Sequence, residues 1–257
     1  MPEIVEQESR DFVNSLARGL EVIRSFTRNK PAMTLSEVAE RTDMNRAAAR
    51  RFLLTLVREG YAETNGKYFR LRPKVLELGF SVLASMDLTE VLRPVMDELA
   101  EKLEESCFAA VLDRDSVIYI ARAESRRFVN VGISIGSRAP AHAMSSGRVL
   151  LAALPDAEFE AYLEALKVEK LTPNTMTSKV KLRAAIDEAR RQGWAIVDQE
   201  YEIGLRSMSV PIKDRAGTTV AALNITCPTP RVTLDDMRVR FLPELQAGAQ
   251  RIAMGLP

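Results

Sequence analysis

The sequence predicts an α+β protein with two domains, and two patterns support this fold class. Near the N-terminus, apolar residues at helical spacing form short segments, and two extended runs around Asn65-Gly66 follow them. Beyond residue 86, helical segments stand before, between and after short extended segments, which is typical of an antiparallel sheet covered by helices. A length of 257 residues is enough for two domains, each with its own core.

The first predicted helix covers residues 14–26. Leu16, Leu20, Ile23 and Phe26 recur at helical spacing, so we expect them to pack under the helices that follow. The proline-containing segment after this helix is predicted to be a loop.

Residues 34–59 predict two further helices joined by a tight turn. Thr34 can cap the first of them with Glu37 as its capping-box partner, and Asn45 can cap the second. The second helix has apolar residues on one face and arginines on the other, and Gly60 suits its end.

A hairpin follows directly. Asn65-Gly66 is the strongest short hairpin signal that a sequence offers, and the extended runs Tyr61–Thr64 and Lys67–Leu71 flank it. Helix, tight turn, helix and hairpin in this order indicate a winged helix-turn-helix, which we assign to residues 1–72.

This motif predicts DNA binding, because the N-terminal end of its second helix lies in the major groove. Arg46 and Arg50 can pair with guanine and Asn45 with adenine, while Ala47 lets the backbone approach the bases. Other side chains suit phosphates. The candidate DNA contacts are Thr34, Ser36, Asn45, Arg46, Ala47, Arg50, Arg51, Lys67 and Arg70. The alternative is that the arginines form an ordinary solvated helix face.

The charge distribution supports the DNA-binding interpretation. The net charge of the whole chain is only +1. Residues 41–74, however, hold nine basic and three acidic side chains, a local net charge of +6, so the remainder is net negative. A basic region on an acidic body is the electrostatic pattern of a compact DNA-binding domain.

Residues 73–85 are predicted to form a connector helix. Pro73 suits a first helical position, and apolar residues circle much of the helix instead of lining one stripe. Such a helix needs a partner beyond its own domain, so we expect it to contribute to a dimer contact. The alternative is burial within one chain.

Residues 86–257 are predicted to form the second domain. Its helices are identified by apolar periodicity and its strands by short apolar or alternating runs bounded by turn residues. The predicted helices are Leu88–Ser106, Ala143–Leu154, Asp156–Leu166, Lys179–Gln192 and Val232–Leu256. The predicted strands are Phe108–Leu112, Val117–Ala121, Phe128–Ile133, Trp194–Glu200, Ser207–Ile212 and Thr218–Thr226.

Composition excludes several classes of protein. A hydrophobic content of 46% and a charged content of 28% are typical of soluble globular proteins, and no apolar run approaches a membrane span. Cys107 and Cys227 lie far apart and His142 is the only histidine, so neither a disulfide framework nor a metal site is indicated. We therefore expect no metal, no cofactor and, without a signal peptide, a cytoplasmic location.

Two segments of the second domain resemble the IclR family of transcriptional regulators, and the resemblance extends over essentially the whole chain. Pro140–Ala152, PAHAMSSGRVLLA, is similar to the small-residue helix start of that family. Gly193–Asp214, GWAIVDQEYEIGLRSMSVPIKD, follows the family signature except at Val197 and Lys213. The matching positions are Gly193, Glu200, Ser207, Met208, Ser209, Ile212 and Asp214. The segment RAAARRFLLTL, residues 46–56, most resembles regulators of aromatic-acid catabolism through the β-ketoadipate (protocatechuate) pathway.

The resemblance implies a GAF-like second domain that binds a small organic acid, aromatic or dicarboxylic, in a homodimer or dimer of dimers on operator DNA. The effector-site residues that it implies are Ser145, Ser146, Leu205, Ser207, Asn224 and Thr226. The residues themselves agree, because a serine pair at a helix start offers hydroxyl and N–H groups to a carboxylate. Asn224 and Thr226 also share one strand face. The alternative is that these are ordinary capping and strand residues.

A second carboxylate on the effector would need a cationic partner, which arginine can provide by bidentate pairing. The candidates are Arg122, Arg126, Arg127 and Arg148. His142, which precedes the serine pair, is expected to be a structural hydrogen-bonding group.

Two other functions remain open. An enzyme would need Cys107 or Ser145 as nucleophile and His142 as base, but the serine lacks the Gly-x-Ser-x-Gly elbow and the cysteine lacks an activating motif. We therefore predict no enzymatic activity. The other alternative is a DNA-binding protein whose second domain only oligomerises. Binding of aromatic or dicarboxylic acids to residues 86–257 would separate it from a regulator.

Overall fold

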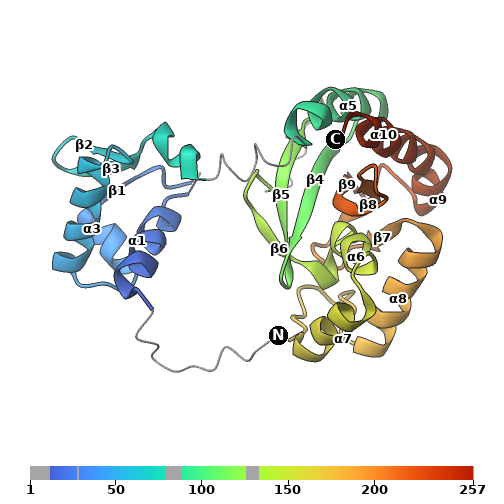
Figure 1. Cartoon of the computed structure of the whole chain (residues 1–257), viewed down its shortest axis with the longest axis horizontal. Coiled ribbons are helices and arrows are strands. Elements are labelled where there is room, and N and C mark those ends of the chain that lie inside the picture. The colour runs from blue at the N-terminus through green and yellow to red at the C-terminus, as the bar shows by residue number, and fades with distance from the viewer. Residues whose placement is uncertain (1–11, 28, 79–87, 126–132, 257) are drawn as a thin grey trace. The chain divides into compact units, whose positions relative to one another are not determined.

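The structure is a computed structural model that describes residues 12–27, 29–78, 88–125 and 133–256. The chain divides into two compact units, residues 1–82 and 83–257. Figure 1 shows the first unit in blue to teal and the second in green to red.

The first unit is a winged helix-turn-helix, as the sequence predicts. Its three short strands form an antiparallel sheet with the order β1-β3-β2. The elements are α1 (Asn14–Ser25), β1 (Ala32–Thr34), α2 (Leu35–Arg41), α3 (Arg46–Arg58), β2 (Ala62–Thr64) and β3 (Tyr68–Leu71). β1 lies at the end of the segment that was predicted to be a loop. It was not predicted because its three residues are too few to show the alternation that identifies a strand.

The predicted caps define where the helices begin. Thr34 Oγ1 accepts a hydrogen bond from the Glu37 N–H (3.4 Å), and the Glu37 carboxylate accepts one from the Thr34 N–H (2.9 Å). Asn45 Oδ1 accepts from the Ala48 N–H at 2.8 Å. In the hairpin, Asn65 Oδ1 accepts from two backbone N–H groups, at 3.1 and 2.8 Å.

The core of the first unit corrects the prediction for α1. The buried apolar residues are Val22, Met33, Val38, Leu53 and Phe69. Phe26 packs against this core, but Leu16 and Leu20 are 63% and 47% exposed, so the prediction that they pack under the other helices is wrong. Val22 and Ser25 are the residues of α1 that face the core. The prediction failed because periodicity does not tell which of two neighbouring stripes on a helix is the buried one.

The predicted connector helix is described only in its first part. Pro73–Leu76 forms a short 3₁₀ helix, η1, with the proline in its first turn, and two helical residues follow. Residues 79–87 lie outside the described residues. The rest of the connector, and the domain limits at residues 72 and 86, stay predictions.

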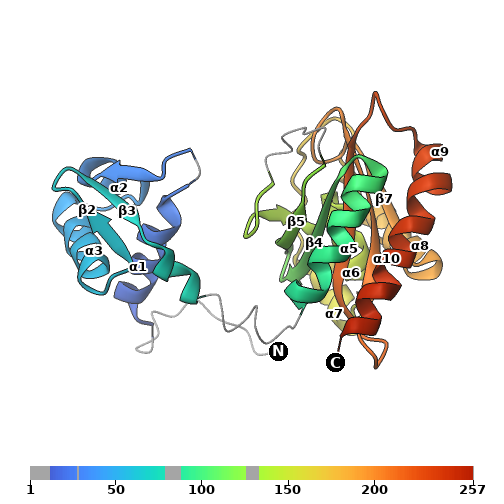
Figure 2. The same ribbon diagram turned by 90° about the horizontal axis from the view of Figure 1, so that it is seen from above.

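The second unit is the predicted α+β domain, one antiparallel sheet of six strands with helices on both faces (Figure 2). The strand order is β6-β5-β4-β9-β8-β7. The strands are β4 (Ser106–Asp113), β5 (Ser116–Ala123), β6 (Arg138–Pro140), β7 (Ala195–Asp198), β8 (Leu205–Lys213) and β9 (Thr219–Pro228). The helices are α5 (Leu88–Leu103), η2 (Ala141–Ala143), α6 (Ser145–Ala152), α7 (Asp156–Ala165), α8 (Lys179–Gln192), α9 (Leu234–Asp236), η3 (Met237–Phe241) and α10 (Leu242–Gly255).

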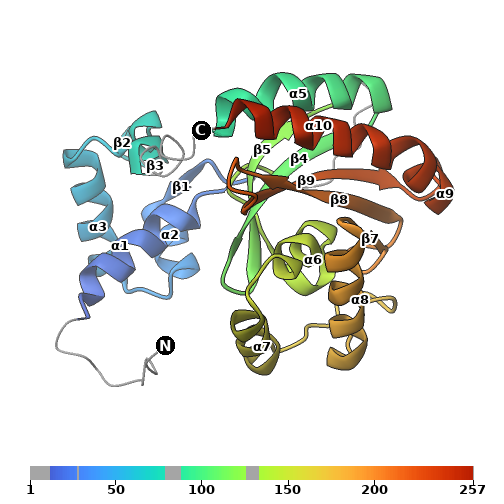
Figure 3. The ribbon, with the colours of Figure 1, turned by 45° about the vertical axis from the view of Figure 1, so that its right-hand side comes forward.

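Different helices cover the two faces of this sheet (Figure 3). α5 and α10 lie side by side on one face, where their apolar residues form a core with β4, β8 and β9. α6, α7 and α8 lie on the other face, and a second core there includes Phe108 and Tyr119. The GAF-like arrangement expected for this domain is therefore present.

Three local features differ from the prediction. β6 was not predicted, and the predicted strand at 128–133 falls almost wholly outside the described residues. α5 ends at Leu103 and not at Ser106, because Glu104 adopts a left-handed backbone (φ 55°). The C-terminal helical run begins after Thr233, which forms a capping box with Asp236, and it passes through the π-helix η3 before α10.

Candidate DNA-binding surface and effector site

The candidate DNA contacts of α3 lie on its exposed face. They are Asn45, Arg46, Ala47, Arg50 and Arg51. The opposite face carries Ala49 and Leu53, which are fully buried in the core of the unit. Because α3 packs through that side, its arginine face is open to solvent.

Two of the candidate residues are engaged in capping. Asn45 Oδ1 caps α3, and a bidentate contact with adenine would need the same oxygen. The Thr34 hydroxyl donates to Glu37 Oε2 at 2.9 Å within the capping box of α2. Ser36, in the first turn of α2, is exposed.

The wing offers two exposed cations, Lys67 and Arg70. Lys67 Nζ lies 5.3 Å from the centroid of the Tyr68 ring at the hairpin tip. Arg70 stands directly across from Glu63 in the antiparallel ladder, so a carboxylate on the same face opposes its charge. Lys67 is therefore the wing cation better suited to a phosphate.

In the second unit, four of the six predicted effector residues meet in one buried hydrogen-bond network. Ser145 Oγ lies 2.9 Å from both Ser207 Oγ and Ser209 Oγ. Asn224 Nδ2 donates to Ser145 Oγ (2.9 Å) and to Ser209 Oγ (3.0 Å), and Thr226 Oγ1 donates to Asn224 Oδ1 (3.1 Å). Ser209 matched the family signature but was not predicted as a site residue. The network ties the start of α6 to β8 and β9.

Strand register places this network in a row across the sheet. Ser209 pairs with Asn224, Asn224 with Phe108, and Phe108 with Arg122, so these four residues share one face. We call this the inner face, the side of the sheet that α6 covers. Polar groups therefore stand next to an aromatic ring and a guanidinium.

Ser146, another predicted effector residue, lies on the inner face but outside the network. Its side chain is fully buried, and its Oγ has no hydrogen-bond partner among the described residues. Tyr119 is also buried, and within the same described part of the chain its hydroxyl has no partner. The Tyr119 ring packs edge-on against Phe108, with 5.5 Å between centroids.

The arginines predicted to bind a second carboxylate differ in their surroundings. Arg148 Nη2 donates to both oxygens of the buried Glu200 carboxylate, each at 2.7 Å, so this arginine is already paired. Arg122 lies with its guanidinium carbon 5.7 Å from the Phe108 ring centroid, and it pairs with the Glu124 carboxylate at 3.1 Å. The other two candidates, 126 and 127, lie outside the described residues.

The remaining predicted residue, Leu205, does not join the network. It is the first residue of β8, stands opposite Pro228 and packs against the apolar core of the inner face. Its contribution in this structure is apolar contact, at the end of the strand that carries Ser207.

The residues of the enzyme alternative do not form a nucleophile and a base. His142 Nε2 donates to the Glu169 carbonyl (3.2 Å), whereas the hydrogen bonds described for Ser145 go to serines and an asparagine. Cys107 is fully buried, and burial raises the pKa of its thiol to about 12. Over the described ranges, no cluster of His, Cys, Asp or Glu side chains suits a metal ion, and no helix combines the length and apolarity to cross a bilayer.

Comparison with known proteins assigns both units to one family. The family model for the bacterial transcriptional regulator IclR C-terminal domain matches residues 80–254, and the model for the IclR helix-turn-helix domain matches residues 15–66. The chain belongs to the IclR family. The winged helix-turn-helix of the structure is thus that of an IclR-family transcriptional regulator.

Among relatives in the IclR family, the Pca regulon regulatory protein of Pseudomonas putida is 42% identical over 93% of this chain and 83% of its own length. A transcriptional regulator from Rhodococcus sp. RHA1 is 48% identical, with a TM-score of 0.84 over 95% of this chain and 98% of its own. An IclR homologue from Microbacterium hydrocarbonoxydans, solved in complex with 4-hydroxybenzoate, is 26% identical with a TM-score of 0.82, covering 93% of this chain and 98% of its own.

Proposed function

We propose that this IclR-family protein is an effector-responsive transcriptional regulator that controls aromatic-acid catabolism. The observation that carries the proposal is the exposed arginine face of α3, which packs through its opposite side and so is open to operator DNA. The similarity of the chain to the Pca regulon regulatory protein supports control of aromatic-acid catabolism. The relative complexed with 4-hydroxybenzoate supports an aromatic acid as the effector.

For DNA, the proposed roles follow from exposure and hydrogen bonding. Arg46 and Arg50 read base edges, and Arg51 and the wing cations contact phosphates. Asn45 acts mainly by capping α3, because its side-chain oxygen accepts from the Ala48 N–H. Thr34 acts in the same way on α2.

For the effector, the proposed site is the inner face of the sheet beside the start of α6. Phe108 offers an aromatic surface, and Arg122 offers the cation for a carboxylate. Glu124, whose side chain is 54% exposed, is the carboxylate that the effector would replace on Arg122. The Ser145 network fixes the position of α6 above this surface. The overlap of aromatic, cationic and hydroxyl groups suits an aromatic acid.

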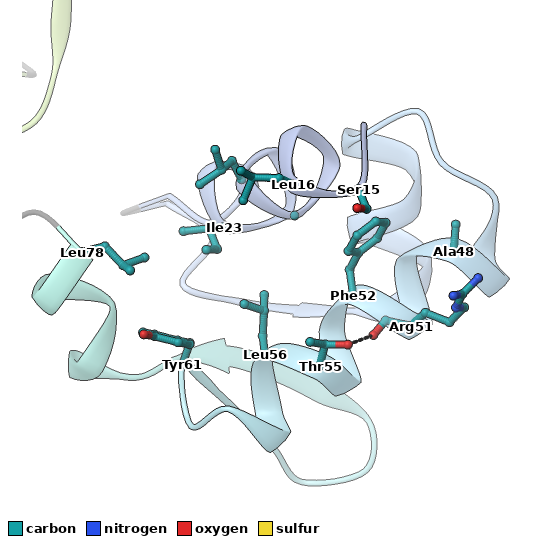
Figure 4. A pocket seen from close by; sticks show the side chains of 12 residues that line it. Ser15, Leu16, Ile23, Ala48, Arg51, Phe52, Thr55, Leu56, Tyr61 and Leu78 are labelled. Carbon is teal, nitrogen blue, oxygen red and sulfur yellow. Dashed lines mark hydrogen bonds between the residues drawn. The ribbon is translucent and has the colours of Figure 1, made fainter. Parts of the chain in front are cut away.

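We also propose that the protein works as a homodimer, since helix-turn-helix dimers read paired half-sites. A cleft of about 680 Å³ lies between α1 and α3 in the first unit (Figure 4). Exposed leucines border it, Leu16 and Leu20 from α1 and Leu78 from the connector, just after η1. Apolar surface of this kind favours a partner, and a second copy would cover it. We further propose that the protein acts in the cytoplasm and carries out no enzymatic step.

The experiment that tests the proposal uses the full-length protein and DNA selected from a random pool. We expect specific binding that weakens steeply with salt, as phosphate contacts require. A thermal-shift screen of aromatic and dicarboxylic acids should then find stabilisation by hydroxybenzoates. Specific DNA binding without a thermal shift from any acid would favour a DNA-binding, oligomerising protein that senses no small molecule.

A further inference from the structure

The polar side chains of the inner face fall into two groups, those that hydrogen-bond to each other and those that have no hydrogen-bond partner among the described residues. Ser145, Ser207, Asn224 and Thr226 bond to each other across α6, β8 and β9. A ligand could bond to these groups only by breaking bonds that hold the helix to the sheet. These side chains therefore hold α6 in place against the sheet. Direct contact with the effector is left to other residues.

Two hydroxyls on the same face lack such partners. Ser146 Oγ, from the first turn of α6, and the Tyr119 hydroxyl, from β5, are both buried and have no hydrogen-bond partner among the described residues. Leaving buried polar groups unpaired destabilises a fold, so an unpaired buried group in a native structure calls for an explanation. A ligand that pairs with both would remove that penalty.

The two hydroxyls lie near each other and beside an aromatic ring. Burial raises the pKa of the Tyr119 phenol well above its usual value, and the nearby Ser146 hydroxyl acts in the opposite direction. Tyr119 therefore stays neutral at physiological pH. The Phe108 ring packs edge-on against Tyr119 on the same face of the sheet, so an aromatic surface adjoins the two hydroxyls.

We infer that Tyr119 and Ser146 are the specificity-determining pair of the effector site, and that they bind a hydroxyl group on the aromatic ring of the effector. This inference rests on the proposed function. Two neutral hydroxyls suit a phenolic hydroxyl, which both donates and accepts, whereas a carboxylate buried between them would lack a cation. The effector carboxylate belongs at Arg122, whose guanidinium carbon lies 5.7 Å from the centroid of the Phe108 ring.

This assignment predicts discrimination against rings that lack a hydroxyl. A site built to hydrogen-bond a hydroxyl rejects the analogue without it, because the groups of the site are then left unpaired. Unhydroxylated benzoate should bind, but more weakly than 4-hydroxybenzoate or 3,4-dihydroxybenzoate. The Ser145 network, by contrast, should affect all three acids alike.

The test is isothermal titration of the full-length protein with benzoate and 4-hydroxybenzoate. Tyr119→Phe and Ser146→Ala should each lower the affinity for 4-hydroxybenzoate about tenfold, the loss of one buried hydrogen bond. Benzoate affinity should change by less than about twofold on the same reasoning. The melting temperature of the ligand-free Tyr119→Phe protein should fall little, because the removed hydroxyl loses only its contact with Ser146.

Tyr162→Phe is the matched control. Tyr162, on α7, is a second tyrosine whose buried hydroxyl has no partner within the described part of the chain, but it lies away from Ser146, in a hollow near the β4–β5 turn. This variant should keep the wild-type preference. An unchanged ratio of the two affinities in both Tyr119→Phe and Ser146→Ala would overturn the inference alone. Wild-type protein that binds neither acid would overturn the proposed function with it.

Discussion

Arg50 projects from the exposed face of α3, one turn beyond Arg46, where it can meet the edge of a guanine. We predict that Arg50→Ala weakens binding to the selected operator by about 1–3 kcal/mol, the usual size of a bidentate base contact. Binding to random DNA should change much less. Fluorescence anisotropy with labelled duplexes measures both.

The control for this prediction is Arg58→Ala, because Arg58 is also exposed but lies at the last turn of the same helix. Its removal should affect operator and random DNA alike. Equal operator affinity for wild type and Arg50→Ala would mean that this side chain reads no base.

Gly147 is the residue that allows the start of α6 to approach η2. A Cβ on Gly147 would lie 2.0 Å from the carbonyl oxygen of Ala141 and 2.5 Å from its Cα, and both atoms belong to the backbone. We predict that Gly147→Ala destabilises the second unit by about 1–3 kcal/mol or more, as overpacking does. It should also weaken effector binding, because α6 carries Ser145 and Ser146.

Urea unfolding measures this effect, followed by Trp194 fluorescence for the second unit and by far-ultraviolet circular dichroism for the helices of both units. Gly19→Ala is the comparison, since the nearest side-chain atom to an added Cβ there is 3.8 Å away, in Phe52. In the middle of α1 that change should be neutral or slightly stabilising. Equal stability of Gly147→Ala and wild type would show that α6 can shift away from η2 at little cost.

At the scale of elements, the capping box of α2 makes the first unit sensitive to acid. The Thr34 N–H, helped by Lys30 and the Thr34 hydroxyl, lowers the pKa of the Glu37 carboxyl from 4.5 to about 2. A carboxyl whose pKa is lower in the folded state stabilises that state above pH 4.5, and this contribution is lost as the pH falls towards 2.

We therefore predict that Glu37→Gln lowers the melting temperature of the first unit at pH 6 and that the difference from wild type shrinks between pH 4.5 and 2. Far-ultraviolet circular dichroism at several pH values measures it. Exposure to solvent keeps the effect small. A difference that is constant across this range would mean that the carboxylate charge contributes nothing to the cap.

The elements that the sequence predicted well are those with a local chemical signal. Thr34, Asn45 and Asn65 each hydrogen-bond the backbone N–H groups that their residue types suggested, so helix starts and hairpin were found. β1 and β6 were missed because three residues cannot show a period. The exposed side of α1 was misassigned because Leu16 and Leu20 form as good an apolar stripe as the buried one.

The candidate site was predictable only in part, for a similar reason. Period-2 spacing put Asn224 and Thr226 on one face, and both do lie in the buried network. Nothing in the spacing indicated that their side chains would bond to each other. The pairing of Arg148 with Glu200, 52 residues apart, and the position of Tyr119 beside Ser146 depend on how β5, α6 and the chain around Glu200 pack, which no local pattern encodes.

At the scale of the whole molecule, an effector-responsive regulator requires its two units to be coupled. In the proposed mechanism, effector bound on the inner face changes the operator affinity of a dimer through the residues that join the units. A coupling of this kind is a free energy, typically about 1–3 kcal/mol, and it acts in both directions. The sign of the coupling decides whether the effector promotes or releases DNA binding.

The most direct test measures the affinity of the full-length protein for its selected operator with and without saturating 4-hydroxybenzoate, and then the affinity for 4-hydroxybenzoate with and without operator. Because coupling is reciprocal, we expect both affinities to change by the same factor, about 5- to 150-fold. Two affinities that are each unaffected by the other ligand would contradict this expectation.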